Sequence, residues 1–184
     1  MTMNNQAFTA IRRKNAKGSN LENNDRLKLI SASNLPSANV ESSSLNNLNI
    51  ENSNLTKANF NKCNIKGATF THSNFEKTSF TWSNLSRNKF IKNNFQKADL
   101  QFSNMRSSHI KESNLKGANL SWSKLDKAVF EKCDLRKANF SGCDLSKVRF
   151  VECNLKGAII DINTKLPFGH ETAKKLGIQN IGLH

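Results

Sequence analysis

Cysteine and histidine are the residue types in this 184-residue sequence best suited to nucleophilic, redox or metal chemistry. There are four of each, and the histidines are scattered. A zinc site needs converging ligands, typically beginning with a close cysteine pair, but no CxxC or paired-histidine spacing is present. We therefore predict no metal site and no cofactor. The cysteines are interpreted as small structural residues, and they are Cys63, Cys133, Cys143 and Cys153.

The sequence also lacks the usual signs of an active site. Tyrosine is absent, carboxylates are not clustered, and no nucleophile stands beside a base. No glycine-rich motif that would cradle a phosphate is present. We expect a protein that is not an enzyme and has no small-molecule substrate.

A five-residue period organises most of the chain. Every fifth residue from Ile30 to Ile160 is large and apolar, at 27 positions without exception or insertion. This period fits neither the 3.6 residues of a helix nor the 2.0 of a strand. The repeat itself therefore indicates the fold.

Almost every unit has a small residue two positions before its apolar centre. Asn or Asp usually stands directly before the centre, and the other two positions are mostly polar. Asn and Asp stabilise tight turns through hydrogen bonds to nearby backbone. Typical segments are Ala58-Asn59-Phe60, Ala98-Asp99-Leu100, Ala118-Asn119-Leu120 and Ala138-Asn139-Phe140.

These segments resemble the pentapeptide-repeat family. The resemblance implies an all-β fold, a right-handed quadrilateral β-solenoid with 20 residues per coil. Residues 30–160 then form six to seven coils, in a rod roughly 30 Å long at the usual strand spacing. Large centres and small residues face inward, because a solenoid unit buries its core only by stacking on its neighbours.

The two ends fall outside this register. Residues 1–29 are polar and basic, and Leu21 is off phase, so we expect a tail or a partial cap. Residues 161–184 are expected to cap the last coil, with a short helix over 171–176 that stops at Gly177. A homodimer contact at this C-terminal end is the functional alternative.

The formal net charge is +14. Such a charge favours acidic partners, although solubility alone is the plainer reading. No run of signal-peptide length or transmembrane span is apparent. We expect a cytoplasmic protein, with export by a specialised secretion system as the alternative.

Stacking residues 20 apart predicts an exterior aromatic column. Trp82, Phe102 and Trp122 each lie two positions after a centre and fall on one line. Contiguous exposed apolar residues mark interaction sites, and Trp is common at binding hot spots. The column is therefore a candidate partner-binding site. Its alternative role is to stiffen one corner of the rod.

A second column forms a basic stripe. These charges are also what a solvated surface without a binding role would carry. Nucleic-acid or anionic-membrane binding through the stripe is less favoured, because no recognised nucleic-acid motif appears. The main lysine column and the aromatic column are also expected on neighbouring sides, not interleaved. The stripe consists of Lys57, Lys77, Lys97, Lys116, Arg136, Lys137 and Lys156.

The family resemblance implies further functions. Its best-understood members protect DNA gyrase as acidic rods that look like duplex DNA. Residues 30–160 instead hold 19 basic against 10 acidic residues, and a basic rod cannot imitate a phosphate backbone. Topoisomerase protection is therefore the disfavoured alternative. We predict a non-enzymatic protein-interaction scaffold, a bacterial regulator or secreted effector, whose protein partner the sequence does not identify.

Overall fold

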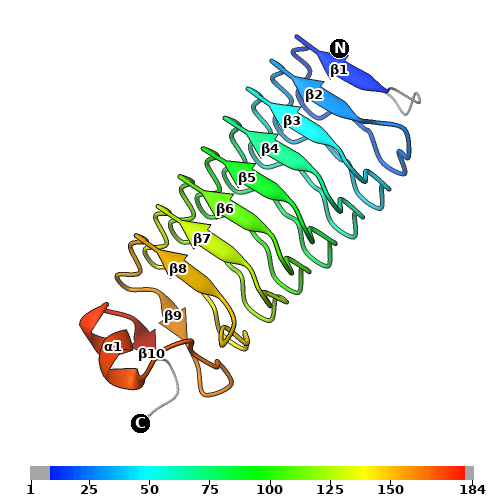
Figure 1. Cartoon of the computed structure of the whole chain (residues 1–184). Coiled ribbons are helices and arrows are strands. Elements are labelled where there is room, and N and C mark those ends of the chain that lie inside the picture. The colour runs from blue at the N-terminus through cyan, green and yellow to red at the C-terminus, as the bar shows by residue number, and fades with distance from the viewer. Residues whose placement is uncertain (1–8, 181–184) are drawn as a thin grey trace.

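The computed structural model describes residues 9–180 and is a parallel β-solenoid. Very short strands recur once per coil (Figure 1), with a single helix near the C-terminus. The elements are β1 (Ala10–Arg12), β2 (Leu29–Ser31), β3 (Asn49–Glu51), β4 (Thr69–Thr71), β5 (Lys89–Ile91), β6 (His109–Lys111), β7 (Val129–Glu131), β8 (Arg149–Val151), β9 (Ile159–Ile160), α1 (His170–Lys175) and β10 (Gln179–Asn180).

Strands β1 to β8 pair in sequence order as one parallel sheet along the rod. From β2 onward each pairing joins residues 20 apart, as with Ile30 and Ile50 or Phe130 and Phe150. The same register continues outside the strands, where the Leu55 amide donates to the Asn74 carbonyl at 2.8 Å. Each coil therefore lies directly on the previous one.

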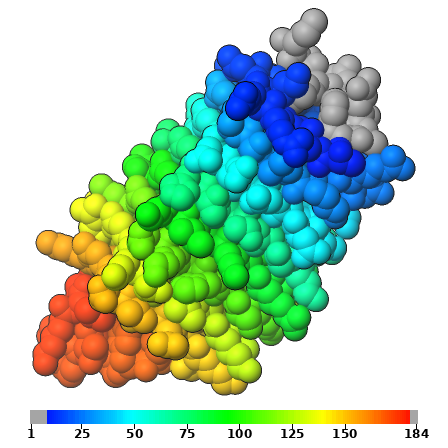
Figure 2. All heavy atoms as spheres, turned by 45° about the horizontal axis from the view of Figure 1, so that its top comes forward, coloured from blue at the N-terminus to red at the C-terminus, as the bar shows by residue number. Residues whose placement is uncertain are grey.

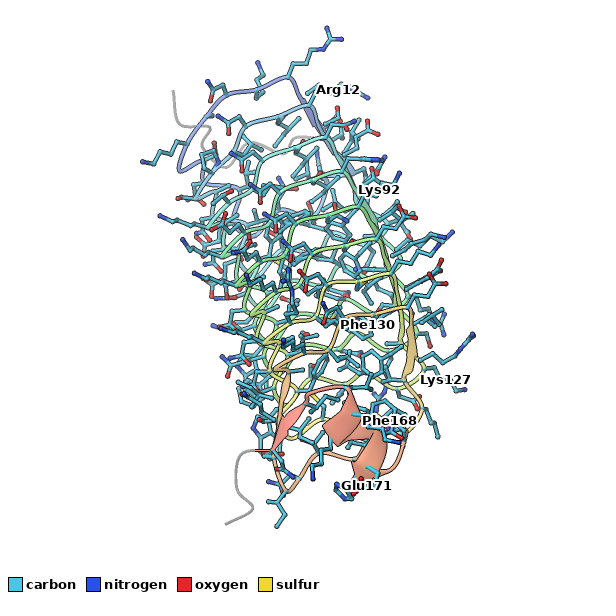
Figure 3. The ribbon with its side chains drawn as sticks, turned by 90° about the vertical axis from the view of Figure 1, so that its left-hand side faces the viewer. Arg12, Lys92, Lys127, Phe130, Phe168 and Glu171 are labelled. Carbon is cyan, nitrogen blue, oxygen red and sulfur yellow. The ribbon has the colours of Figure 1, made fainter. Side chains whose placement is uncertain are left out.

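The five-residue period produces four sides. Side one carries β1–β8, and sides two, three and four follow in chain order, beginning with the centres Leu35, Val40 and Leu45. Every predicted centre is buried except Phe150, which is partly buried. Figure 3 shows Phe130 inside the coil while Lys92 and Lys127 project outward. The prediction of an apolar axis is confirmed.

The residues before the centres form the turns, as expected. The side-chain oxygen of Asn74 accepts a hydrogen bond from the Glu76 amide at 3.0 Å, and Asn94 does the same for Gln96 at 3.1 Å. Two positions after most centres the backbone enters the left-handed region, with φ of 56° at Lys77 and 58° at Ser42. This turn directs the chain from one side to the next.

Stacked backbone begins before residue 30. Strand β1 pairs with β2 over a 19-residue step, Ile11 against Ile30, and Leu21 is fully buried. The expectation that Leu21 is off phase described the sequence correctly, but this residue still reaches the axis. The Ser44 amide donates to the Asn24 carbonyl, 20 residues away, whereas the Asn49 amide donates to the Lys28 carbonyl, 21 residues away. The chain is therefore one residue shorter than the regular coil between Asn24 and Lys28. The Asn24 side chain closes the short turn by accepting from the Leu27 amide at 2.9 Å.

The C-terminal end is closed by a different arrangement. β10 pairs in parallel with β9, and α1 lies beside them at the end of the rod (Figure 1). Phe168 packs against the core while Glu171 points away from it (Figure 3). The predicted short helix is present one residue earlier than expected, and Gly177 follows it with φ of 71°.

Two predicted cap residues remain exposed. Ile162 is 74% exposed and Leu176 is 38% exposed. Apolar surface therefore remains at the end where a homodimer contact is predicted. Residues 1–8 and 181–184 of the two terminal segments lie outside the described residues.

The solenoid has about nine turns, more than the six to seven expected. The difference arises because stacking continues past both ends of the unbroken register, through β1 at one end and β9–β10 at the other. The coils form one continuous rod in the space-filling view (Figure 2).

Candidate binding faces

The aromatic column lies at the corner between sides three and four. Trp82, Phe102 and Trp122 are 64%, 39% and 51% exposed. The Trp82 and Phe102 rings stack with centroids 4.5 Å apart and planes 8° from parallel. Solvent-exposed rings are therefore held in register by the coil spacing.

Trp122 breaks the stack. Its ring lies over Gly142 in the next coil, where a Cβ atom would come within 2.5–2.6 Å of three ring carbons. Because one face of Trp122 covers Gly142, its other face is turned toward the coil of Phe102. A hollow of about 300 Å³ lies beside this break, lined in part by Phe102, Trp122 and Lys124.

The backbone under these rings is unusual for large residues. Trp82, Phe102 and Trp122 have φ values of 62°, 57° and 59°. Left-handed backbone costs an L-residue roughly 1–2 kcal/mol and is uncommon for bulky side chains. Ser42 and Gly142 occupy the same column with the same backbone conformation. The turn therefore does not require an aromatic residue.

The basic stripe lies at the corner between sides two and three. Its members are exposed apart from Lys116, which is partly buried. The stem of Lys97 passes near Gly117, and that of Lys137 passes near Gly157, where an added Cβ would lie 3.7 and 3.4 Å from the respective Cγ atoms. The lysine stems therefore lie along the corner against the next coil.

Two members of the stripe are paired with acids. Lys77 lies 3.3 Å from Glu76, and Arg136 forms a bidentate pair with Asp134. Hydrogen bonds from the guanidinium hold the pKa of Asp134 below its usual range. Beside the stripe runs a ladder of asparagines, as expected, with the Asn54 amide donating to Asn34 at 2.8 Å and Asn94 to Asn74 at 3.0 Å.

The cysteines occupy the small inward positions that the repeat predicts. Cys63, Cys133 and Cys143 are buried, and Cys153 is partly buried. Burial raises the pKa of Cys63 to about 12. Hydrogen bonding between the two neighbouring thiols lowers the pKa of Cys153 and raises the pKa of Cys133. Within residues 9–180, no group of three or more His, Cys, Asp or Glu residues is arranged to hold a metal ion.

Sequence reasoning missed a further set of cations on side four. The aromatic column borders exposed basic residues of this side as well as facing the basic stripe across side three. The expectation on interleaving concerned only the main lysine column and did not consider these cations. No single column reveals this set, because its members alternate between neighbouring positions of the repeat. They are Lys66, Arg87, Arg106, Lys124 and Lys127.

These features define a pentapeptide-type solenoid with structured outer faces. A family model described as "Pentapeptide repeat region" matches residues 43–120 and 83–160. The chain belongs to this family. No curated protein matches the sequence. None of the helices in the described part of the chain has the length and apolar character needed to cross a membrane.

Solved structures of pentapeptide-repeat proteins are similar to this chain. QnrB1, a plasmid-mediated fluoroquinolone resistance protein, is 18% identical with a TM-score of 0.43, over 94% of this chain and 90% of its own. HetL of the cyanobacterium Nostoc sp. strain PCC 7120, involved in heterocyst differentiation regulation, is 17% identical with a TM-score of 0.43, over 89% and 83%. The Nostoc protein alr5209 is 24% identical with a TM-score of 0.46, over 59% and 84%.

Proposed function

We propose that the protein is a non-enzymatic interaction rod whose aromatic column anchors a protein partner. The observation that carries this proposal is the exposure of Trp82, Phe102 and Trp122 at turn positions where Ser42 and Gly142 serve equally well. Large aromatics placed on strained, solvated backbone gain little for the fold. Trp in particular is enriched among the residues that dominate binding energy.

The surface of side three, next to the aromatic column, suits a protein interface. The Gln101 amide donates to Asp99 at 3.1 Å, and the Ser121 hydroxyl lies 3.3 Å from the other end of Gln101. These polar groups bond to one another, and the Gln101 amide satisfies the Asp99 carboxylate. On the far edge of side three lies the basic stripe. An aromatic anchor with a charged rim is the usual composition of a protein interface, where rim charges steer association.

The net positive charge of the rod favours an acidic partner surface. It argues against imitation of duplex DNA, and hence against topoisomerase protection of that kind.

The test compares capture of proteins from bacterial and eukaryotic lysates by wild type and by the Trp82→Ser/Trp122→Ser double variant. We expect a specific protein to be retained by wild type and lost by the variant. Ser42 shows that serine is compatible with this backbone, so the variant should fold normally, as its unfolding midpoint would verify.

Ile162→Ser is the matched control. Ile162 is an exposed apolar residue near the C-terminal end of the rod, outside the aromatic segment, so its replacement should leave capture unchanged. Retention of the same proteins by the double variant would contradict the proposal.

A further inference from the structure

We propose that side four, bordered by the aromatic column, binds single-stranded nucleic acid. This goes beyond the proposed protein partner, because it assigns a second ligand to a different side of the rod. The aromatic edge is shared, while the charges involved are those of side four and not those of the basic stripe.

The first argument is an uncompensated positive strip. Within residues 9–180, the side chains of Lys66, Arg87, Arg106, Lys124 and Lys127 form no ion pair, and all five are exposed. They span about three coil steps, or roughly 15 Å at the usual strand spacing. That length suits several successive phosphates and exceeds what one small anion requires.

The two acids that line the hollows of this side, Asp126 and Asp144, each form an exposed ion pair with a lysine outside the strip. Asp126 lies 3.7 Å from Lys147, and Asp144 lies 3.5 Å from Lys165. Neither carboxylate pairs with any of the five free cations. The strip therefore presents positive charge to a ligand with little opposing charge.

The strip is also hollowed continuously. The hollow beside Phe102 and Trp122 shares Lys124 with a second hollow of about 480 Å³ that reaches Arg106. Arg106 also lines a third hollow of about 240 Å³, which extends to Arg87 and Lys66. A flexible chain can therefore follow the strip from the aromatic edge to its other end.

The break in the aromatic column supplies a place for a base. Trp82 and Phe102 are in stacking contact, so nothing planar can enter between them. All three rings of the column line the first hollow together with Lys124, and the Trp122 ring leans over Gly142 in the next coil. A planar base stacked there would place its phosphate near Lys124 and Arg106.

These two features together favour a single strand. Stacking of a base on an aromatic ring contributes about 1–3 kcal/mol and tolerates any base, while lysine and arginine follow the backbone. A duplex keeps its bases stacked on each other and offers none to Trp122. An acidic polypeptide satisfies the charges but does not require the open ring faces.

The experiment titrates the whole protein with a labelled oligothymidylate of about twenty nucleotides, within the range of known single-strand sites. Anisotropy of the label reports binding. Intrinsic fluorescence reports on this site alone, because the chain has two tryptophans, both in the column, and no tyrosine. We expect saturable binding with quenching. The logarithm of the binding constant should fall with the logarithm of the salt concentration with a slope of roughly −2 to −3.5 for three to five phosphate contacts.

Two charge-matched variants separate side four from the basic stripe. Arg106→Gln/Lys124→Gln should weaken binding about tenfold or more, since each removes one phosphate contact. Lys57→Gln/Lys97→Gln removes the same charge from the stripe and should change affinity less than about threefold.

Several outcomes overturn the proposal. They are no binding at low salt, binding without a change in tryptophan emission, and equal weakening by both variants. Equal affinity for a duplex or for polyglutamate of similar charge would also overturn it and indicate a purely electrostatic surface. The aromatic edge serves both proposals, so lysate capture is measured after nuclease treatment, which removes proteins retained only through nucleic acid. Loss of the remaining capture in the Trp82→Ser/Trp122→Ser variant then tests the protein partner, whereas the Arg106→Gln/Lys124→Gln variant tests nucleic-acid binding alone.

Discussion

Stacked aromatic rings run along this rod both inside and outside. Inside, Phe75 and Phe95 stack at 4.9 Å and 8°, and outside, Trp82 and Phe102 stack at 4.5 Å and 8°. The geometry is nearly the same, because the coil spacing sets both. The inner rings are 3% exposed or less, whereas the outer rings are 39% or more exposed. Similar stacking therefore serves the fold in one place and leaves surface for a ligand in the other.

The inner stack is expected to dominate stability. Phe75 is fully buried and also contacts Phe70 and Phe80, at centroid distances of 5.6 and 5.8 Å. Phe75→Ala should lower the free energy of unfolding by about 3–5 kcal/mol, through lost burial and a cavity. Chemical denaturation followed by circular dichroism measures it. Phe75→Leu is the milder control, and Trp82→Ser is the outer counterpart, expected to cost about 1 kcal/mol or less. Equal losses of unfolding free energy in Phe75→Ala and Trp82→Ser would contradict the expected difference between the inner and outer rings.

A smaller effect is expected where the outer column meets the backbone. Gly142→Ala places a methyl group against the Trp122 ring at left-handed backbone, with φ of 70°. Gly117→Ala pays the same backbone cost of roughly 1–2 kcal/mol, but its new methyl lies 3.7 Å from Lys97, an ordinary contact. Gly142→Ala should therefore be the less stable variant and should alone shift tryptophan emission. Identical unfolding midpoints and spectra would mean that the contact between Trp122 and Gly142 has no influence.

The smallest effect concerns thiols at the boundary between inside and outside. Cys153 has its pKa lowered to about 7 and is partly buried, whereas Cys63 has its pKa raised to about 12 by burial. Because the thiolate is the reactive form and the pKa of Cys153 is lowered, iodoacetamide should modify Cys153 first, at a lower pH than an ordinary thiol requires. Peptide mass spectrometry measures this. Cys133→Ala removes the donated hydrogen bond and should slow Cys153 at neutral pH. Modification of all four cysteines at the same rate would contradict the expected order.

The central coils were predictable from sequence because the register is unbroken. Leu21 lies outside the register because a single residue is missing between Asn24 and Lys28, which shifts the phase of the sequence without changing the stacking. The regular spacing of Ile11, Ala16 and Leu21 was the available signal, since all three are buried.

The outer faces were predictable only in part. Residues 20 apart identified the aromatic column, because its members share one repeat position. The tilt of Trp122 over Gly142 depends on a neighbour without a side chain, which a column of residue types does not express. The cations of side four were missed because Arg106 and Arg87 occupy adjacent repeat positions and meet only when side chains extend across the surface.

Because every coil from β2 to β8 has twenty residues, the rod can gain or lose whole coils during evolution. Duplication or loss of one whole coil between β2 and β8 would keep every centre on its own side, so neighbouring coils would still match. A change of any other size would rotate the following segment to a different side and separate Trp122 from Phe102. Duplication of coils can therefore lengthen the aromatic edge or the basic strips in steps of one coil, while both ends of the rod stay unchanged.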